Sequence, residues 1–183
     1  MTTDYLISTE RTILRPWRED DAEVLFRWAS NPAVGPIAGW AAHRSVEESR
    51  EVIRTVFATA ECYAVVLRSS GEPIGAVAIK SDERLIGSLQ GLPDAELGYW
   101  LAEPYWGRGL MTEVVSAIVR RAFDELGYRR LWCGYYEGNE RSRRVMEKCG
   151  FVFHHTEEEK LTLLGDRRTE HFLCLERNGL SNE

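Results

Sequence analysis

Two closely spaced glycines, Gly107 and Gly109, are the residues whose spacing first suggests chemistry. They follow the apolar segment from Glu96 to Leu101 and lead directly into a run of apolar residues with helical spacing. Glycine has no Cβ, so the backbone N–H groups around it can approach an anion closely. A helix N-terminus adds unpaired donors and a partial positive charge. The loop therefore predicts a binding site for a pyrophosphate group.

Three kinds of pyrophosphate loop contain such glycines. A P-loop requires GxxxxGK[ST], a run that the chain lacks. A dinucleotide fingerprint requires GxGxxG; Gly107 and Gly109 fit its start, but Thr112 occupies the third glycine position. The third kind is the pyrophosphate loop of CoA-binding proteins. A plain helix start, in which the glycines only permit a turn, is the remaining alternative.

The segment from Tyr105 to Glu113 resembles the acetyl-CoA loop of the GCN5-related N-acetyltransferase (GNAT) superfamily. It follows the version of the ribosomal-protein N-acetyltransferase (RimJ/RimL-type) branch, Tyr-Trp-Gly-x-Gly-x-x-Thr-Glu. The general superfamily pattern, Q/R-x-x-G-x-G/A, is met strictly only at Gly109, because Trp106 and Met111 occupy its two ends. A second motif of the branch, N-x-x-S-x-x-x-x-x-K-x-G-F, matches residues 139–151. Both motifs occur in the family order, and the resemblance covers nearly the whole chain.

The resemblance implies an acetyl-CoA-dependent N-acetyltransferase that releases CoA. It implies direct attack of a primary amine on the thioester in a ternary complex, with a protein N-terminal α-amino group or a small-molecule amine as the acceptor. Backbone N–H groups of residues 99–101 would donate to the thioester oxygen and pair with the pantetheine amides. The cofactor-binding residues implied are Tyr99, Trp100, Leu101, Trp106, Gly107, Arg108, Gly109, Leu110, Met111, Thr112, Asn139 and Ser142.

Ser142 and Glu96 are the candidates for proton transfer. Many superfamily members carry a Tyr at the position of Met146, which cannot donate a proton. In the ribosomal branch a Ser at the position of Ser142 serves instead or holds CoA, so we expect Ser142 to protonate the leaving thiolate. The alternative is a hydroxyl that only bonds the Asn139 backbone at the helix start. Asn139 is expected to touch the pantetheine arm, to cap the helix, or both.

Glu96 lies on the strand that leads to the thioester, and it is the candidate base, acting through a water. Its alternative role is that of a surface strand residue. Trp40 and His43 are candidates for the acceptor site, whereas a solvated loop position is the alternative for His43. Neighbouring His154 and His155 lie on opposite sides of a strand, so no metal site is predicted from them.

Composition limits the other functional classes. The 183 residues suit one domain, 1–183, and six Trp, seven Tyr and six Phe supply apolar area for a core. The net charge of −6 argues against a nucleic-acid partner. No apolar run reaches the ~20 residues of a membrane span, and no signal peptide is visible, so a cytoplasmic protein without a membrane partner is expected. None of the four Cys forms a CxxC pair, which favours free thiols over zinc or disulfides.

Hydrophobic periodicity and turn residues predict mixed strands and helices in a single-domain α+β fold. The resemblance implies a GNAT-like fold, with a mixed, mostly antiparallel sheet of about seven strands flanked by about four helices. The expected strands are 9–15, 62–67, 74–79, 96–101, 131–136, 151–155 and 168–175. Helices are expected after Asp20–Asp21, after a capping box at Ser45 and Glu48, over about 109–126, and from Asn139 to Gly150. Many members of the branch pair as dimers, so a homodimer is the oligomer that the resemblance implies.

Two other functional classes are compatible with parts of the pattern. A CoA-binding sensor or scaffold without transferase activity would explain Met146 at the Tyr position. A nicotinamide-dependent dehydrogenase would use Gly107 and Gly109, but no acidic residue closes a following strand, and the third glycine is absent. Turnover of acetyl-CoA with amines separates the first class from an enzyme, and NAD binding compared with CoA binding separates the second.

Overall fold

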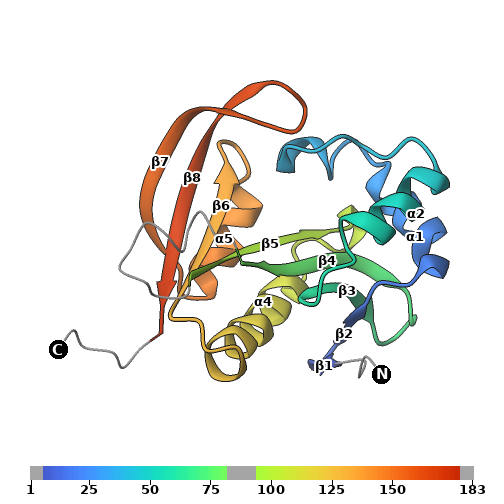
Figure 1. Cartoon of the computed structure of the whole chain (residues 1–183), viewed down its shortest axis with the longest axis horizontal. Helices are drawn as coiled ribbons and strands as arrows, with labels where there is room; N and C mark the ends of the chain where they lie inside the picture. Colours follow the sequence, from blue (N-terminus) through green and yellow to red (C-terminus); the bar gives the residue numbers. More distant parts are fainter. Residues whose placement is uncertain (1–5, 82–93, 178–183) are drawn as a thin grey trace.

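The computed structural model describes residues 6–81 and 94–177, and their strands form one sheet in the order β1-β2-β3-β4-β5-β6-β8-β7 (Figure 1). Among the strands of these residues, only β5 and β6 pair in parallel, which confirms the mixed, mostly antiparallel sheet of an α+β fold. The strands are β1 (Ile7–Ser8), β2 (Thr12–Pro16), β3 (Cys62–Leu67), β4 (Pro73–Lys80), β5 (Asp94–Leu101), β6 (Arg130–Tyr136), β7 (Val152–Leu161) and β8 (Arg167–Glu176).

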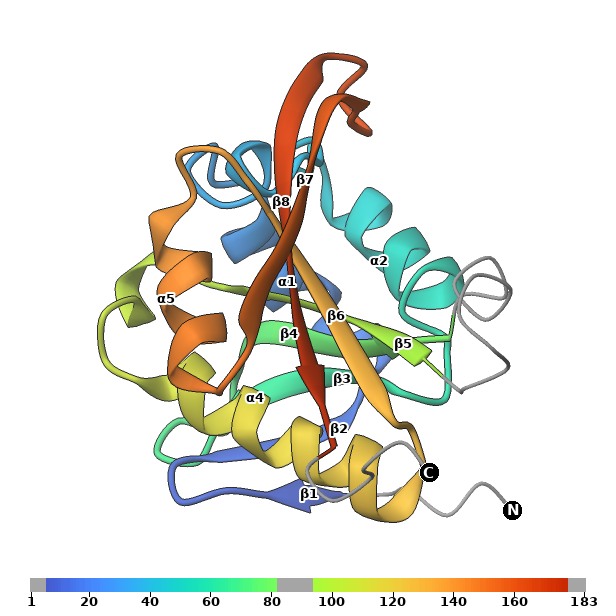
Figure 2. The same cartoon turned by 90° about the vertical axis from the view of Figure 1, so that its left-hand side faces the viewer.

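Helices lie on both faces of the sheet. The α-helices of the described residues are α1 (Ala22–Ala29), α2 (Val46–Thr55), α4 (Leu110–Arg120) and α5 (Glu140–Lys148). Helices α1 and α2 pack together over one face, and α4 lies on the opposite face beside α5 (Figures 1 and 2). Short helical turns lie at Glu19–Asp21, Pro36–Ala38 and Glu103–Tyr105.

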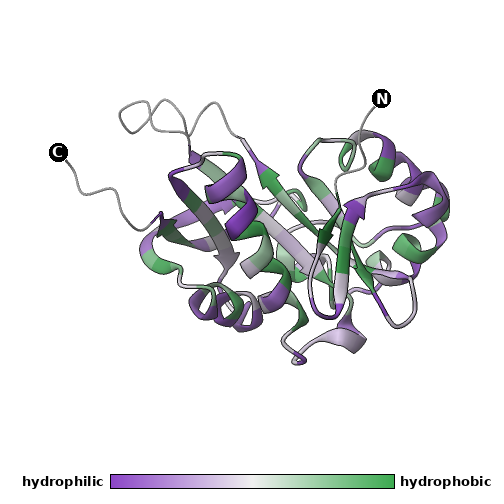
Figure 3. Cartoon of the chain, turned by 90° about the horizontal axis from the view of Figure 1, so that it is seen from below, coloured by the Kyte–Doolittle hydropathy of each residue, from purple (hydrophilic) through white to green (hydrophobic). Residues whose placement is uncertain are grey.

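The central strands are buried on both faces, which explains their continuous apolar runs. On β3, Tyr63 and Val65 belong to the cluster beneath α4, whereas the neighbouring side chains point toward the other face. A second cluster joins α1 and α2 through Leu25 and Ile53. Figure 3 shows the hydrophobic residues concentrated in the central strands, with hydrophilic residues on the outer sides of the helices.

The caps predicted at Ser45 and Asn139 are confirmed, whereas Asp21 at the start of α1 makes no side-chain cap bond. The Ser45 hydroxyl accepts a hydrogen bond from the Glu48 N–H at 3.0 Å, and the Asn139 side chain accepts one from the Ser142 N–H at 3.4 Å. The helix predicted over 109–126 begins at Leu110, but its last part is a π-helical turn, Arg121–Glu125. Ala122 and Phe123 of this turn remain buried, so its apolar spacing looked helical in the sequence.

The β7–β8 hairpin is longer than its predicted strands, and β1 was not predicted. The hairpin extends beyond the rest of the sheet (Figure 1). Most of β7 is exposed on both faces, so its outer half lacks the alternation of apolar and polar residues that marks a half-buried strand. A register shift at 153/155 lets both His154 and His155 contact the Trp132 ring, at 4.8 and 6.1 Å between centroids.

No cluster suited to a metal ion occurs within 6–81 and 94–177, and no helix there is long and apolar enough to cross a bilayer. The thiols are free: Cys62 and Cys133 are buried, whereas Cys149 and Cys174 are half-buried.

Candidate functional site

Strands β5 and β6 separate in the middle of the sheet. They pair at only three positions, from Asp94↔Arg130 to Glu96↔Trp132. Beyond these positions β5 pairs with β4, and β6 pairs with β8. Among the described strands, the edge of residues 97–101 that faces β6 therefore has no ladder partner, although the Cys133 thiol donates to the Leu97 carbonyl at 3.1 Å. The opening can receive an extended ligand that pairs with backbone amides.

Two cavities meet at this opening. The loop cleft encloses about 400 Å³ beside the glycine loop, and the aromatic pocket encloses about 790 Å³ beneath α1 and α2. Their shared lining residues are Ala38, Tyr99, Trp100, Asn139 and Ser142. A molecule bound in each cavity would therefore meet the other at the ends of β5 and α5.

The loop cleft contains all but one of the residues proposed to bind cofactor. These lining residues are Tyr99, Trp100, Leu101, Trp106, Gly107, Gly109, Leu110, Met111, Thr112, Asn139 and Ser142. The exception is Arg108, whose guanidinium lies over the Tyr105 ring, 5.6 Å from its centroid.

The backbone of the loop depends on glycine. Gly107 has φ +73° and Gly109 has φ +76°, in the left-handed region that disfavours other residues. No described atom lies within 4 Å of where a Cβ of Gly107 would be, so the approach to its backbone is open. Met111 is 5% exposed and packs in the core beneath α4. Its side chain is thus accommodated away from solvent, although the family pattern has a small residue there.

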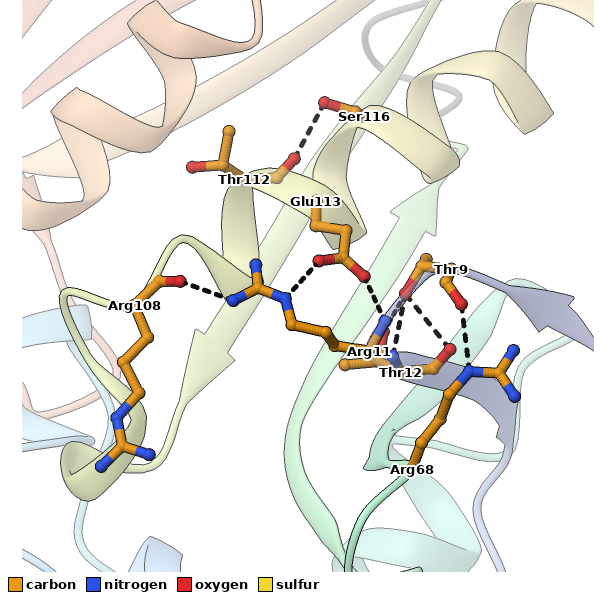
Figure 4. Close-up of polar contacts among 8 residues, drawn as sticks. All are labelled: Thr9, Arg11, Thr12, Arg68, Arg108, Thr112, Glu113 and Ser116. Atoms are coloured by element: carbon orange, nitrogen blue, oxygen red, sulfur yellow. Dashed lines mark hydrogen bonds and ion pairs between the residues drawn. The ribbon is translucent and has the colours of Figure 1, made fainter.

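Arg11 fixes the loop to the first turn of α4 (Figure 4). Its backbone N–H and Nε each donate to the Glu113 carboxylate at 2.8 Å, and one terminal N–H donates to the Arg108 carbonyl at 2.9 Å. Partial burial raises the pKa of Glu113, but hydrogen bonds from Thr9 and Arg11 outweigh it and lower the pKa overall. The carboxylate is therefore ionised at neutral pH and holds the loop through charge-assisted bonds.

Three basic side chains of α5 line the loop cleft and were missed by the sequence analysis. Arg141, Arg144 and Lys148 lie on one helix face, with the Arg141 guanidinium 4.4 Å from the Trp106 ring centroid. Their spacing of three and four residues was the available signal. Cations on the rim of a cleft that has a helix N-terminus suit a ligand with several phosphates.

Ser142 and Tyr99 form a hydroxyl pair where the cavities meet. The Tyr99 hydroxyl donates to the Ser142 carbonyl at 3.0 Å and lies 3.0 Å from the Ser142 hydroxyl. Burial raises the pKa of Tyr99 well above its ordinary value, so this phenol stays protonated. Met146 is 1% exposed in the core and lines neither cavity. Sequence reasoning had assigned Tyr99 through its backbone and missed its hydroxyl.

The aromatic pocket contains Trp40 and His43, the two residues proposed for the acceptor site. The Trp40 ring packs 6.0 Å from Trp100 and 5.7 Å from His43, measured between centroids. His43 Nδ1 lies 2.8 Å from the hydroxyl of buried Ser49, so His43 is not a freely solvated loop residue. Burial lowers the pKa of His43, which favours the neutral imidazole at neutral pH.

Besides Glu48 of α2, two carboxylates line the aromatic pocket, one from each side of the opening. Glu96, on β5, keeps 38% of its side chain exposed and lies 3.9 Å from Lys80 Nζ. Glu170, on β8, keeps only 13% exposed and lies 2.7 Å from Lys160 Nζ. Sequence reasoning missed Glu170, because no motif marks it and only the pairing of β6 with β8 brings it to the pocket.

Comparison with known proteins agrees with this geometry. The family model described as the acetyltransferase (GNAT) domain matches residues 11–152. The chain is 29% identical over 152 residues to the uncharacterized N-acetyltransferase YoaA of Bacillus subtilis, covering 80% of this chain and 82% of YoaA.

Solved structures share the fold. The ribosomal-protein-S5-alanine acetyltransferase of Vibrio fischeri superimposes with a TM-score of 0.74 and 19% identity, over 97% of this chain and 100% of that one. Mycobacterium smegmatis RimJ, solved in complex with CoA-disulfide, gives a TM-score of 0.75 and 20% identity, over 95% and 88% of the two chains.

Proposed function

This chain belongs to the GNAT acetyltransferase family and is an N-acetyltransferase that uses acetyl-CoA, and we propose that it joins the acetyl group to a primary amine where the loop cleft meets the aromatic pocket. The observation that carries this placement is the shared wall of the two cavities, at the point where β5 and β6 separate. One cavity suits a phosphate-bearing cofactor, and the other suits an amine acceptor.

The loop cleft fits acetyl-CoA by the chemistry of its donors. Gly107 and Gly109 expose backbone N–H groups at the start of α4, and Arg141, Arg144 and Lys148 supply positive charge. Bound acetyl-CoA supplies a thioester whose carbonyl carbon accepts the amine and whose thiolate leaves.

The residues of this chain then have three tasks. Backbone N–H groups on the unpaired edge of β5, within residues 99–101, are proposed to stabilise the negative charge that develops on oxygen. Ser142 is proposed to supply the proton for the thiolate, with the Tyr99 hydroxyl beside it. A carboxylate of the aromatic pocket is proposed to take the proton of the amine, and Glu96 is the sequence-based candidate.

A protein N-terminal α-amino group is the acceptor that we propose. One structural neighbour is named as a ribosomal-protein-S5-alanine acetyltransferase, and the aromatic pocket encloses about 790 Å³, a volume that the first residues of a peptide could fill. A small-molecule amine is the competing acceptor. The cytoplasmic location, the homodimer and the absence of nucleic-acid binding stay predictions from the sequence.

A panel assay tests this function. Acetyl-CoA turnover is followed by release of free thiol, with peptides bearing free N-termini, polyamines, amino acids and aminoglycosides as acceptors. We expect turnover with peptides and none with the same peptides blocked at the N-terminus. Turnover confined to polyamines or aminoglycosides would replace the peptide with a small-molecule acceptor. Acetyl-CoA binding without turnover of any amine would favour the alternative of a sensor module, which the acetyltransferase relatives do not support.

A further inference from the structure

We propose that Glu170 and Glu96 together bind the ammonium group of the acceptor, and that Glu170 takes the proton which this group must lose before it attacks. The proposal rests on the acetyltransferase function above and names a proton acceptor that the sequence motifs do not contain.

The position of Glu170 depends on a glycine in the neighbouring strand. A Cβ at Gly134 would lie 2.5 Å from Glu170 Oε1, so the carboxylate occupies the space above Gly134. Gly134 and Gly98 both line the aromatic pocket, on the two strands that separate. The absence of side chains there leaves Glu170 facing the opening, with Glu96 on the other side.

Glu170 keeps one oxygen available for a ligand. Oε2 forms an ion pair with Lys160 Nζ at 2.7 Å but makes no hydrogen bond of good geometry, and Oε1 accepts no hydrogen bond from residues 6–81 or 94–177. Lys160 Nζ is itself 3.2 Å from the Glu157 carboxylate and 4.3 Å from the Phe172 ring centroid. Lys160 is thus held by other partners as well, and it does not neutralise Glu170 completely.

The charged groups around Glu170 have a net negative charge that a bound cation can balance. Its charged neighbours are Glu157 and Lys160 on β7, and Glu96 on β5, which lies near Lys80. With Glu170 itself, these groups carry one net negative charge. The uncharged groups that face Glu170 are Tyr136 and Cys133 of β6. Arg168 on β8 is not counted, because it is paired with Asp166. One ammonium group would balance the cluster.

Burial makes Glu170 a better base than an exposed glutamate. Burial raises its pKa, the Lys160 ammonium opposes that rise, and the charges of Glu96 and Glu157 add to it, so the pKa lies above its ordinary value. A base is most effective when its pKa approaches the working pH. Glu96 is more exposed and is placed to help hold the ammonium.

The proton and bond changes balance without a further reactant. An ammonium proton passes to Glu170, and the free amine nitrogen forms the C–N bond while the C–S bond breaks. The thiolate takes one proton, and the amide nitrogen loses its extra proton. Glu170 returns its own proton to solvent when the products leave.

The pH dependence of Glu170→Gln tests the proposal, with a peptide acceptor bearing a free N-terminus. The wild type binds the ammonium form and removes the proton itself. Its kcat/KM for peptide should therefore vary little between pH 6 and 7.5, below the α-amino pKa of about 8. The variant needs amine that is already neutral, so its kcat/KM should rise about tenfold per pH unit. Its defect should thus be about 100-fold larger at pH 6 than at pH 8.

Three controls make the result specific. Glu157→Gln removes a partner of Lys160 that does not line the pocket, and it should keep the flat wild-type profile. Glu170→Asp keeps the charge and should remain flat at a lower rate, which also carries the test if the Gln variant does not fold. The KM for acetyl-CoA should change less than about twofold in all three variants.

Two outcomes would overturn the assignment. A loss in Glu170→Gln that is equal at every pH, or a sloping profile for Glu170→Asp, would make Glu170 structural. If the steep rise of kcat/KM with pH appears in Glu96→Gln instead, Glu96 is the base. In either case, wild-type turnover of the peptide would leave the proposed function standing, whereas no wild-type turnover would mean that the function itself had failed.

Discussion

The hydroxyl pair of Ser142 and Tyr99 raises the question of which group protonates the thiolate. If Ser142 does, Ser142→Ala should lower kcat by roughly ten- to a thousandfold, at or below the usual range for general acid catalysis. The KM for acetyl-CoA should change little, since one neutral hydrogen bond contributes ~1 kcal/mol. Steady-state kinetics of Ser142→Ala and Tyr99→Phe check this. A normal kcat in the first variant with a low kcat in the second would assign the proton to Tyr99, 3.0 Å away.

Neighbouring arginines on α5 allow a matched test of cofactor binding. Arg144 lines the loop cleft, whereas Arg143 does not and instead pairs with Glu140 and Glu147. We expect Arg144→Ala to raise the KM for acetyl-CoA by about three- to tenfold. Losing a fully buried hydrogen bond to a charged group would raise this KM somewhat more. Arg143→Ala should leave this KM unchanged. With acetyl-pantetheine, which lacks the phosphates, the two variants should have the same KM. A different KM would exclude a phosphate contact of Arg144.

At the scale of elements, the start of α4 combines a backbone requirement with a proposed role in binding acetyl-CoA. Gly109 and Gly71 have left-handed φ of +76° and +73°, but Gly71 lies in the β3–β4 hairpin, away from both cavities. Substituting either by Ala should cost a similar ~1–2 kcal/mol in the free energy of unfolding. Only Gly109→Ala should also weaken acetyl-CoA binding. Urea unfolding and calorimetric titration of both variants check this, and equal binding by both would make Gly109 purely structural.

At the scale of the whole molecule, acetyl-CoA should stabilise the native fold. A ligand at 100 times its Kd stabilises the native state by ~2.7 kcal/mol, which for a chain of this size raises Tm by about 5–10 °C. Residues of β5, α4 and α5 line the loop cleft, so bound acetyl-CoA should stabilise the packing of these three elements. Thermal melts with millimolar acetyl-CoA measure the shift, and NAD at the same concentration is the control. An equal shift with NAD would revive the dinucleotide alternative.

The sequence by itself determined the local features of the protein. Glycines at the start of α4, the cap at Asn139 and the apolar runs of β3 and β4 are set by neighbouring residues, so their patterns could be recognised directly. The family motifs placed the loop cleft for the same reason, because each motif is one continuous segment. Even the exceptions were local: the π-helical turn after α4 keeps an apolar spacing close to that of an α-helix.

The tertiary structure decided which distant side chains meet. Arg11 reaches Glu113 across 102 positions of sequence, and Glu170 reaches the pocket only because β8 pairs with β6 over Gly134. Strand order and register depend on long-range pairing, and a shift of one residue would turn Glu170 to the opposite face. Periodicity in one strand cannot reveal its partner. The glycine loop that lines the loop cleft was therefore predictable from sequence, whereas Glu96 and Glu170 became a pair only in the folded sheet.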